Sequence, residues 1–124
     1  MQELVIIRGI PGSGKTTMAK SYQGYSHYEA DMFFMKDGVY NFDRAKIKNA
    51  HNWCQESVKS DLHAGKSVIV SNTFVARWEV QPYVDMALAL NVPYKIITAT
   101  GNYQNVHGVP PEVIERMKKN WENF

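Results

Sequence analysis

Short strand-like runs, most of them continuously apolar, alternate along the chain with longer segments of helical spacing. Continuous apolar runs of this length are typical of strands buried on both faces of a parallel sheet. The runs predict strands over residues 4–7, 26–30, 68–70 and 94–99. Strands that alternate with helices in this way imply crossover connections between parallel neighbours.

The segments between these runs predict four helices. Residues 17–23 are helix-compatible and end at Gly24, and Asp43 is placed to cap a long helix that ends at Gly65. The apolar positions of that long helix keep a helical spacing: Ile47, Ala50, Cys54, Val58 and Leu62. Two more helices are expected over 78–90 and from Pro111 to about residue 121, whereas 32–42 and 101–111 read as irregular loops.

These elements predict an α/β fold, a three-layer sandwich around a mostly parallel sheet of about four strands. With 124 residues and no linker or repeat, the chain is expected to form a single domain over residues 1–124. Ligands of such sheets bind at the carboxyl ends of the strands. The functional candidates are therefore the residues that follow each strand.

Residues 9–16 read GIPGSGKT, an unbroken match to the G-x-x-x-x-G-K-[ST] phosphate-binding loop, between a predicted strand and a predicted helix. The glycines let backbone N–H groups turn toward phosphate oxygens. Lys15 supplies a positive charge for the β- and γ-phosphates, and the Thr16 hydroxyl is placed to bind Mg²⁺. The expected nucleotide-binding residues are Gly9, Ile10, Pro11, Gly12, Ser13, Gly14, Lys15, Thr16 and Thr17.

A phosphoryl transfer also needs a positioned nucleophile, and Asp31 is the leading candidate to activate a hydroxyl group. It ends the second predicted strand, and Glu29, two residues earlier, is a weaker candidate on the same face. The third strand ends at Ser71 and Asn72 without the acidic residue that often holds Mg²⁺ through water. This absence argues against a water-activating ATPase or switch GTPase.

Four segments together resemble the polynucleotide-kinase-like P-loop kinases, a group common in bacteriophages. They are the phosphate-binding loop, Glu29-Ala30-Asp31, Ser71-Asn72-Thr73 and the segment from Asn105 to Pro110. In phage polynucleotide kinase the residue that matches Asp31 is the base that takes the acceptor's proton. The residue that matches Asn72 is an aspartate there, and an arginine of the lid matches Gln104, so two charged positions are missing here.

The resemblance implies a P-loop kinase that transfers the γ-phosphate of ATP, with Mg²⁺, to an alcohol group of nucleic acid. The first-ranked acceptor is the 5-hydroxymethyl group of 5-hydroxymethyluracil in phage DNA, a step of thymine hypermodification. A 5′-hydroxyl polynucleotide kinase, a non-catalytic nucleotide-binding module and a kinase of a nucleotide sugar are the alternatives. Candidate substrate or lid residues are Asn72, Asn105, His107 and Arg116.

Composition and charge say less about the function than the motifs do. A net charge of +2 neither demands nor excludes a nucleic-acid partner, while the lack of a large insertion favours an open cleft and a large acceptor such as a nucleic acid. Seven aromatic residues between Tyr22 and Phe42 surround the proposed base, either stacking on bases or packing the core. No apolar run is long enough to span a membrane, and the single cysteine, Cys54, suits a reducing, cytoplasmic setting (the host cytoplasm for a phage protein).

Overall fold

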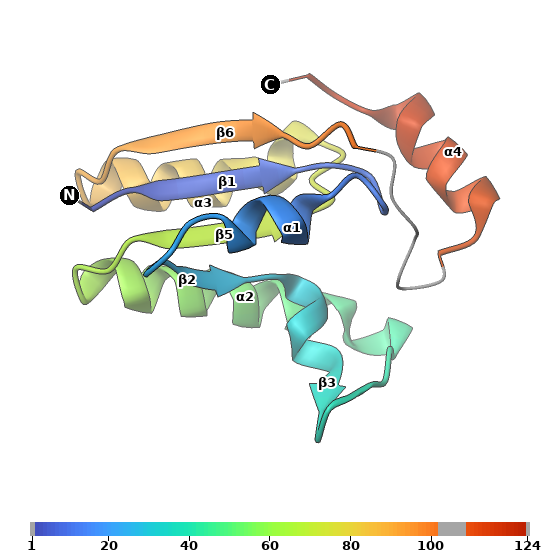
Figure 1. Ribbon diagram of the computed structural model, residues 1–124, viewed down its shortest axis with the longest axis horizontal. Coiled ribbons are helices and arrows are strands. Elements are labelled where there is room, and N and C mark those ends of the chain that lie inside the picture. The colour runs from blue at the N-terminus through green and yellow to red at the C-terminus, as the bar shows by residue number, and fades with distance from the viewer. Residues whose placement is uncertain (1, 102–108, 124) are drawn as a thin grey trace.

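A four-stranded parallel sheet forms the centre of the molecule, in a computed structural model that describes residues 2–101 and 109–123. Its strand order is β2-β5-β1-β6, and all three neighbouring pairs are parallel. The strands are β1 (Leu4–Arg8), β2 (Ser26–Tyr28), β5 (Val68–Asn72) and β6 (Tyr94–Thr98). The predicted α/β class with a parallel sheet of four strands is thus confirmed (Figure 1).

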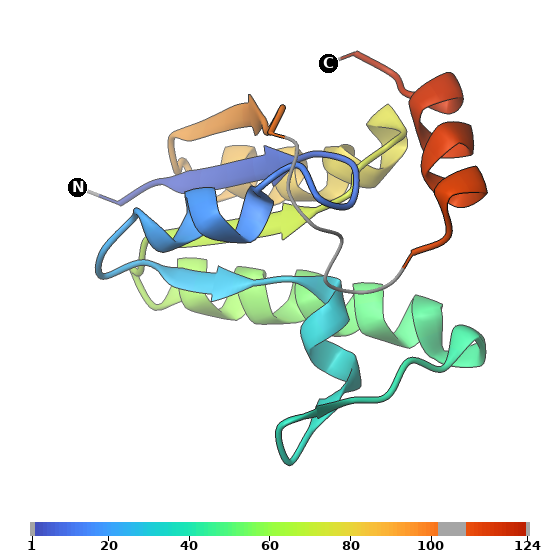
Figure 2. The same ribbon diagram turned by 45° about the vertical axis from the view of Figure 1, so that its right-hand side comes forward.

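Helices cover the two faces of the sheet unequally. Helix α1 (Lys15–Lys20) lies on one face, and α2 (Ile47–His63) with α3 (Arg77–Ala89) lies on the other, which gives the three layers seen in Figure 1. Helix α4 (Pro111–Asn120) has no buried residue and lies beyond the carboxyl ends of the strands, as Figure 2 shows from a second side.

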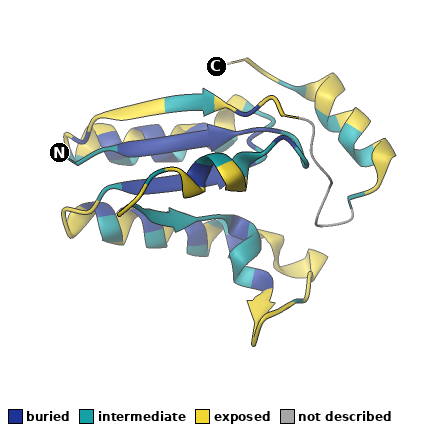
Figure 3. Ribbon diagram, viewed as in Figure 1, coloured by how far each residue is buried: buried dark blue, intermediate teal, exposed yellow. Residues whose placement is uncertain are grey.

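The alternation of side chains along β1 divides the core into two clusters. Leu4 and Ile6 pack with the buried residues of α2 and α3, whereas Val5 and Ile7 pack with Ala19 of α1. All five residues of β1 and of β5 are buried, because both strands lie inside the sheet and are covered on both faces (Figure 3). This explains why residues 4–7 and 68–70 are continuously apolar.

The arm between β2 and α2 contains more regular structure than the sequence predicted. A 3₁₀ helix, η1 (Ala30–Phe34), is followed by a hairpin of β3 (Met35–Lys36) and β4 (Val39–Tyr40). The expected turn at Asp37 and Gly38 joins the two short strands, and both residues have positive φ, 52° and 80°. Asp43 caps a 3₁₀ turn, η2 (Arg44–Lys46), that leads into α2, rather than α2 itself.

Helix α1 begins earlier and ends earlier than the sequence predicted. It starts at Lys15, directly after Gly14 with φ 91°, so the phosphate-binding loop feeds straight into the helix without an intervening residue. It ends at Lys20, with Ser21 as the capping residue, three residues short of the predicted end at position 23. Gly24 still has a positive φ of 82°, but it belongs to the turn that leads to β2.

The last residue of β1 is a buried arginine that joins three segments of the chain. Arg8 is 1% exposed, and its guanidinium donates hydrogen bonds to the carbonyl oxygens of Phe74, Val75 and Glu122. It also lies 4.3 Å from the centre of the Trp121 ring. Because Glu122 donates its own N–H to the Val75 carbonyl, the segment after α4 is hydrogen-bonded to the segment that follows β5.

Among the described residues, no helix is both long and apolar enough to cross a membrane.

We expect Arg8→Met to lower the free energy of unfolding by about 3 kcal/mol, because buried carbonyls lose a charged donor. Urea denaturation followed by circular dichroism measures the change. Arg44→Met removes the same group from the exposed η2 turn and should change stability by less than about 0.5 kcal/mol. Equal, small losses in both variants would show that the Arg8 hydrogen bonds contribute little.

Candidate active site

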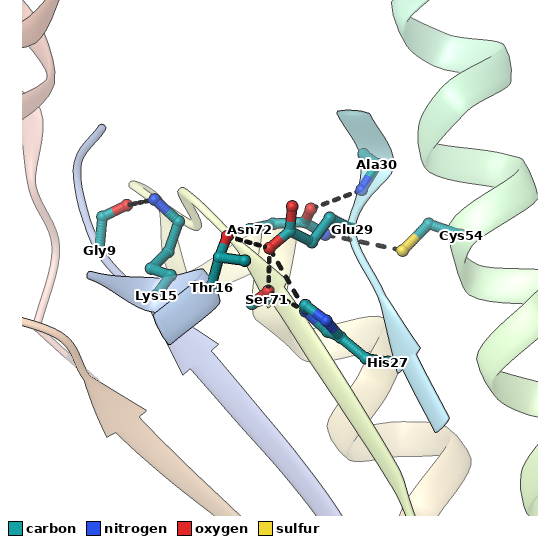
Figure 4. Close-up of polar contacts among 9 residues, drawn as sticks. All are labelled: Gly9, Lys15, Thr16, His27, Glu29, Ala30, Cys54, Ser71 and Asn72. Atoms are coloured by element: carbon teal, nitrogen blue, oxygen red, sulfur yellow. Dashed lines mark hydrogen bonds and ion pairs between the residues drawn. The ribbon is translucent and has the colours of Figure 1, made fainter. Parts of the chain in front are cut away.

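The phosphate-binding loop is held by its own backbone and by the lysine that follows it. Gly12 and Gly14 have φ values of 83° and 91°, which side chains other than glycine rarely adopt. The Lys15 ammonium donates hydrogen bonds to the carbonyl oxygens of Gly9 and Ile10, at 2.8 and 3.2 Å. The lysine side chain therefore lies across the mouth of the loop, where a phosphate group would exchange for these carbonyl partners (Figure 4).

Gly9 leaves no room for a side chain. A Cβ atom there would lie 2.3 Å from the Ser13 hydroxyl and 3.1 Å from the carbonyl oxygen of Ala99. The buried Ser13 hydroxyl itself has no hydrogen-bond partner among the described residues. Gly101 donates its N–H to the Ser13 carbonyl, so the loop is also fastened to the segment after β6.

Two carboxylates act on Lys15 from the neighbouring segment. Burial lowers the pKa of Lys15, while the charges of Glu29 and then Asp31 oppose that change. The electrostatic effect places both acids close enough to the loop to influence a triphosphate bound there. The predicted pairing of the loop with Asp31 in a phosphotransfer reaction stays a prediction.

Glu29 makes several short polar contacts at this edge of the sheet. Its Oε2 atom accepts hydrogen bonds from the hydroxyls of Thr16 at 2.7 Å and Ser71 at 2.8 Å, and lies 3.3 Å from His27 Nε2 (Figure 4). Because the Ser71 proton goes to Glu29, the His27 nitrogen is the donor in its own 2.7 Å contact with the Ser71 oxygen.

These contacts decide the charge of Glu29. Burial raises its pKa, but hydrogen bonds from His27, Thr16 and Ser71 outweigh burial and lower the pKa to about 2. The group is therefore an anion at neutral pH. The sequence indicated Glu29 only as the weaker candidate for an active-site carboxylate, because it does not show which side chain faces Glu29 from the next strand.

Asp31 lies in the 3₁₀ helix η1 and not at the end of a strand, since β2 already ends at Tyr28. Glu29 and Asp31 therefore do not share a strand face, contrary to the prediction. The Tyr40 hydroxyl donates a hydrogen bond to Asp31 Oδ1 at 3.2 Å, so the hairpin helps to orient this carboxylate. Burial and the charge of Asp31 in turn raise the pKa of Tyr40 to about 12.

Asn72 uses its amide group inside the fold. Its oxygen accepts the Ala30 N–H at 2.8 Å, and its nitrogen lies 3.8 Å from the Cys54 sulfur (Figure 4). The residue is buried and fixes the start of η1, one residue before Asp31. A direct contact of Asn72 with substrate or with a lid stays a prediction.

The other candidate substrate residues are less well placed by the structure. Arg116 is exposed on α4. Asn105 and His107 lie outside the described residues, as does Gln104, so the expected lid segment stays a prediction.

Most of the aromatic residues near Asp31 pack against one another. Ring contacts run from Trp53 of α2 through Phe33 and Phe34 of η1 to Tyr40 and Phe42, with centroids 5.1 to 6.4 Å apart. Phe34 is buried, whereas Phe42 is 51% exposed. Tyr22 and Tyr25 pack on the opposite face of the sheet, so they do not surround Asp31 as the sequence suggested. The core interpretation is the better one for most of this set.

A hollow of about 190 Å³ adjoins the outer flank of the loop. It is lined by Gly9, Ile10, Ser13, Trp121 and the four residues 98–101. Glu29, which is hydrogen-bonded to Thr16, follows β2 and lies on the other side of β1 in the sheet. The loop thus lies between the hollow at the end of β6 and the Glu29 carboxylate.

The residues at this edge suit a Mg²⁺ ion that is bound mainly by water and phosphate better than a metal ion that is bound entirely by protein side chains. Within residues 2–101 and 109–123 no group of three or more His, Cys, Asp or Glu side chains is arranged to hold a metal ion. Mg²⁺ typically keeps several waters and binds one or two protein oxygens together with substrate phosphates. The Thr16 hydroxyl beside the Glu29 carboxylate fits that description.

Comparisons with known proteins agree with this geometry. A family model described as an AAA domain (AAA_33) matches residues 4–101. Human NEDD4-binding protein 2 is 32% identical to this chain. The match covers 98% of this chain but only 8% of NEDD4-binding protein 2.

Solved structures show the same fold at low sequence identity. A chain of the Pnkp1/Rnl/Hen1 RNA repair complex superposes with a TM-score of 0.73 at 19% identity, over 96% of this chain and 43% of that one. Kti12 of Chaetomium thermophilum in complex with ADP-AlF3 gives a TM-score of 0.70 at 15% identity, over 97% of this chain and 80% of that one.

We expect Gly9→Ala to weaken ATP binding by about tenfold or more, because the new Cβ must push Ser13 or the loop out of position. Isothermal titration calorimetry measures the affinity. Gly24→Ala is the matched control, since its Cβ meets open space and its positive φ should cost only about 1 kcal/mol of stability. Unchanged affinity in the Gly9 variant would show that the loop is not the nucleotide site.

Proposed function

Because the chain belongs to the AAA_33 family of AAA domains, we propose that it is an ATP-dependent kinase acting on a hydroxyl group of nucleic acid. The observation that carries the proposal is that the charge of Asp31 acts on Lys15 of the phosphate-binding loop, while the next residue, Thr16, is hydrogen-bonded to Glu29. A phosphate-binding loop and a carboxylate on the acceptor side are the two halves of a phosphotransfer site.

The donor half follows from the loop. Its N–H groups and the Lys15 ammonium bind the β- and γ-phosphates of ATP, and Lys15 stabilises the charge that develops on the transferred group. Thr16 would hold Mg²⁺, which neutralises phosphate charge when bound. Lys15 must first leave the carbonyl oxygens of Gly9 and Ile10, so the donor replaces two hydrogen bonds that the free loop makes for itself.

The acceptor half is assigned to Asp31. Its carboxylate accepts the proton of the acceptor hydroxyl while the new bond forms between that oxygen and the γ-phosphorus. The bond between the γ-phosphorus and the bridging oxygen breaks, and ADP leaves with the electron pair. The Tyr40 hydrogen bond holds the carboxylate in place for this step.

Two features of the arm next to Asp31 support a nucleic-acid acceptor. Exposed apolar side chains stand on and beside the hairpin: Met35, Val39 and Phe42 are 47%, 64% and 51% exposed. Residues 36–48 also carry four basic side chains, Lys36, Arg44, Lys46 and Lys48, against two acidic ones, Asp37 and Asp43. Phe42 is the aromatic ring among the three, and an exposed ring that stacks on a base beside cations that contact phosphates is a usual element of single-strand binding.

Two acceptor hydroxyls are proposed, in order. The 5-hydroxymethyl group of 5-hydroxymethyluracil in DNA is placed first, on the resemblance to phage kinases seen in the sequence. A terminal 5′-hydroxyl is second, and the similarity in fold to a chain of an RNA repair complex supports it.

We expect labelled γ-phosphate of ATP to be transferred to at least one nucleic acid. The panel comprises DNA with 5-hydroxymethyluracil, DNA and RNA with 5′-hydroxyl ends, free nucleosides, gluconate and a nucleotide sugar. Digestion of the labelled product to nucleosides shows whether the label is on a base or at an end. Transfer only to a small molecule would overturn the nucleic-acid assignment and leave the kinase assignment intact.

We expect Asp31→Asn to reduce phosphate transfer by about 10²-fold or more while ATP affinity changes by less than about threefold. The exposed hairpin residue Asp37 offers a matched control, Asp37→Asn, which should keep full activity. Calorimetry and the transfer assay separate binding from chemistry. Full turnover by the Asp31 variant would remove it from the role of base, and ATP binding without any transfer by the unaltered protein would favour a nucleotide-binding module.

A further inference from the structure

We propose, building on the kinase function above, that Glu29 is the acidic residue of the Mg²⁺ site, taking the place of the carboxylate that is missing after β5. Strand β5 ends in Ser71 and Asn72, neither of which carries a charge. Glu29 directly follows β2, the strand next to β5, and contacts both Thr16 and Ser71.

The contact with Thr16 has the direction that metal binding requires. The Thr16 hydroxyl donates its only proton to Glu29 Oε2 at 2.7 Å. Its oxygen lone pairs are therefore directed away from the carboxylate and stay available to a cation. A hydroxyl held in this way is a better ligand than one that rotates freely, because the cost of orienting it has already been met.

The second oxygen of Glu29 is available for the water shell of the ion. All three contacts of the carboxylate, from Thr16, Ser71 and His27, involve Oε2. In the described part of the chain Oε1 has no partner, although the side chain is only 14% exposed. An ionised oxygen in that position can accept a hydrogen bond from a metal-bound water.

The register of the sheet makes Ser71 equivalent to Glu29 in space. Tyr28 of β2 pairs with Val70 of β5, so the next residues along, Glu29 and Ser71, lie side by side. The 2.8 Å hydrogen bond between their side chains confirms this adjacency. A carboxylate on either strand would reach the same place, which is why the charge can be exchanged between the two positions.

The other polar groups at this edge are engaged elsewhere. Asn72 gives its amide oxygen to the Ala30 N–H and faces Cys54. Asp31 Oδ1 accepts a hydrogen bond from the Tyr40 hydroxyl, which belongs to the arm between β2 and α2. Glu29 is thus the carboxylate that contacts the proposed metal-binding hydroxyl, and we describe it as a positioning residue because it acts through Thr16 and water.

The test compares ATP affinity with and without Mg²⁺ by calorimetry. We expect Mg²⁺ to raise the affinity of the unaltered protein and expect Glu29→Gln to remove about tenfold or more of that gain. Affinity in EDTA should stay the same or rise in this variant, because a negative charge next to the triphosphate is gone. Glu56→Gln, an exposed change on α2, is the matched control and should behave as the unaltered protein.

Moving the negative charge to the neighbouring strand tests the role of Glu29 more directly. Glu29→Ser combined with Ser71→Asp moves the carboxylate from the residue after β2 to β5 and should restore most of the Mg²⁺ dependence that Glu29→Ser alone loses. A merely structural role for Glu29 would not be rescued in this way. If the exchanged pair fails to fold, as judged by thermal melting, the Glu29→Gln result decides alone.

The outcomes distinguish this proposal from the function on which it rests. Full Mg²⁺ dependence in folded Glu29→Gln would overturn the role of Glu29 while leaving the kinase assignment untouched. No ATP binding by the unaltered protein, with or without Mg²⁺, would overturn the kinase assignment itself.

Discussion

The fixed register of the buried parallel strands is the constraint on which the site depends. β1 and β5 are buried along their whole length, so a slip of one residue would exchange the side chains that pack on α1 with those that pack on α2 and α3 and would misalign the strand ends. With Ile7 beside Ser71 and Arg8 beside Asn72, the strands reach their carboxyl ends at the same level. The same edge of the sheet therefore carries the phosphate-binding loop, Glu29 and the start of η1. The positions of the polar groups are thus determined by the packing of apolar ones.

Two charged side chains at this edge are stabilised by several hydrogen bonds each. Arg8 is buried among carbonyl oxygens and the Trp121 ring, and Glu29 is surrounded by hydroxyls and an imidazole. An isolated charge in such a position would be costly, and several hydrogen bonds offset that cost. Arg8 joins segments of the chain and has a structural role. Glu29 keeps one oxygen without a partner among the described residues, and the proposal that it acts on a bound ion rests on this asymmetry.

Much of the fold was predictable because its signals are local. The phosphate-binding loop, the apolar runs and the buried positions Ala50, Cys54, Val58 and Leu62 of α2 are all apparent from spacing alone. The hairpin of β3 and β4 was missed because each strand has only two residues, too few for a periodic pattern. The network around Glu29 was missed for a different reason. It joins residues of two strands and a loop, and their adjacency follows from strand order and register, which one sequence does not contain.

The hydrogen bond between Glu29 and Ser71 has a consequence for how this sequence can change over evolutionary time. The two residues are 42 positions apart in the chain, yet they share one place in space. We expect their substitutions to be epistatic: an acid gained at one position makes loss of the acid at the other tolerable, whereas two acids together repel. A search that requires an acid at a fixed position after the third strand would then reject chains in which the charge has moved to its neighbour. The constraint under selection would be one negative charge at one site, irrespective of the strand that carries it.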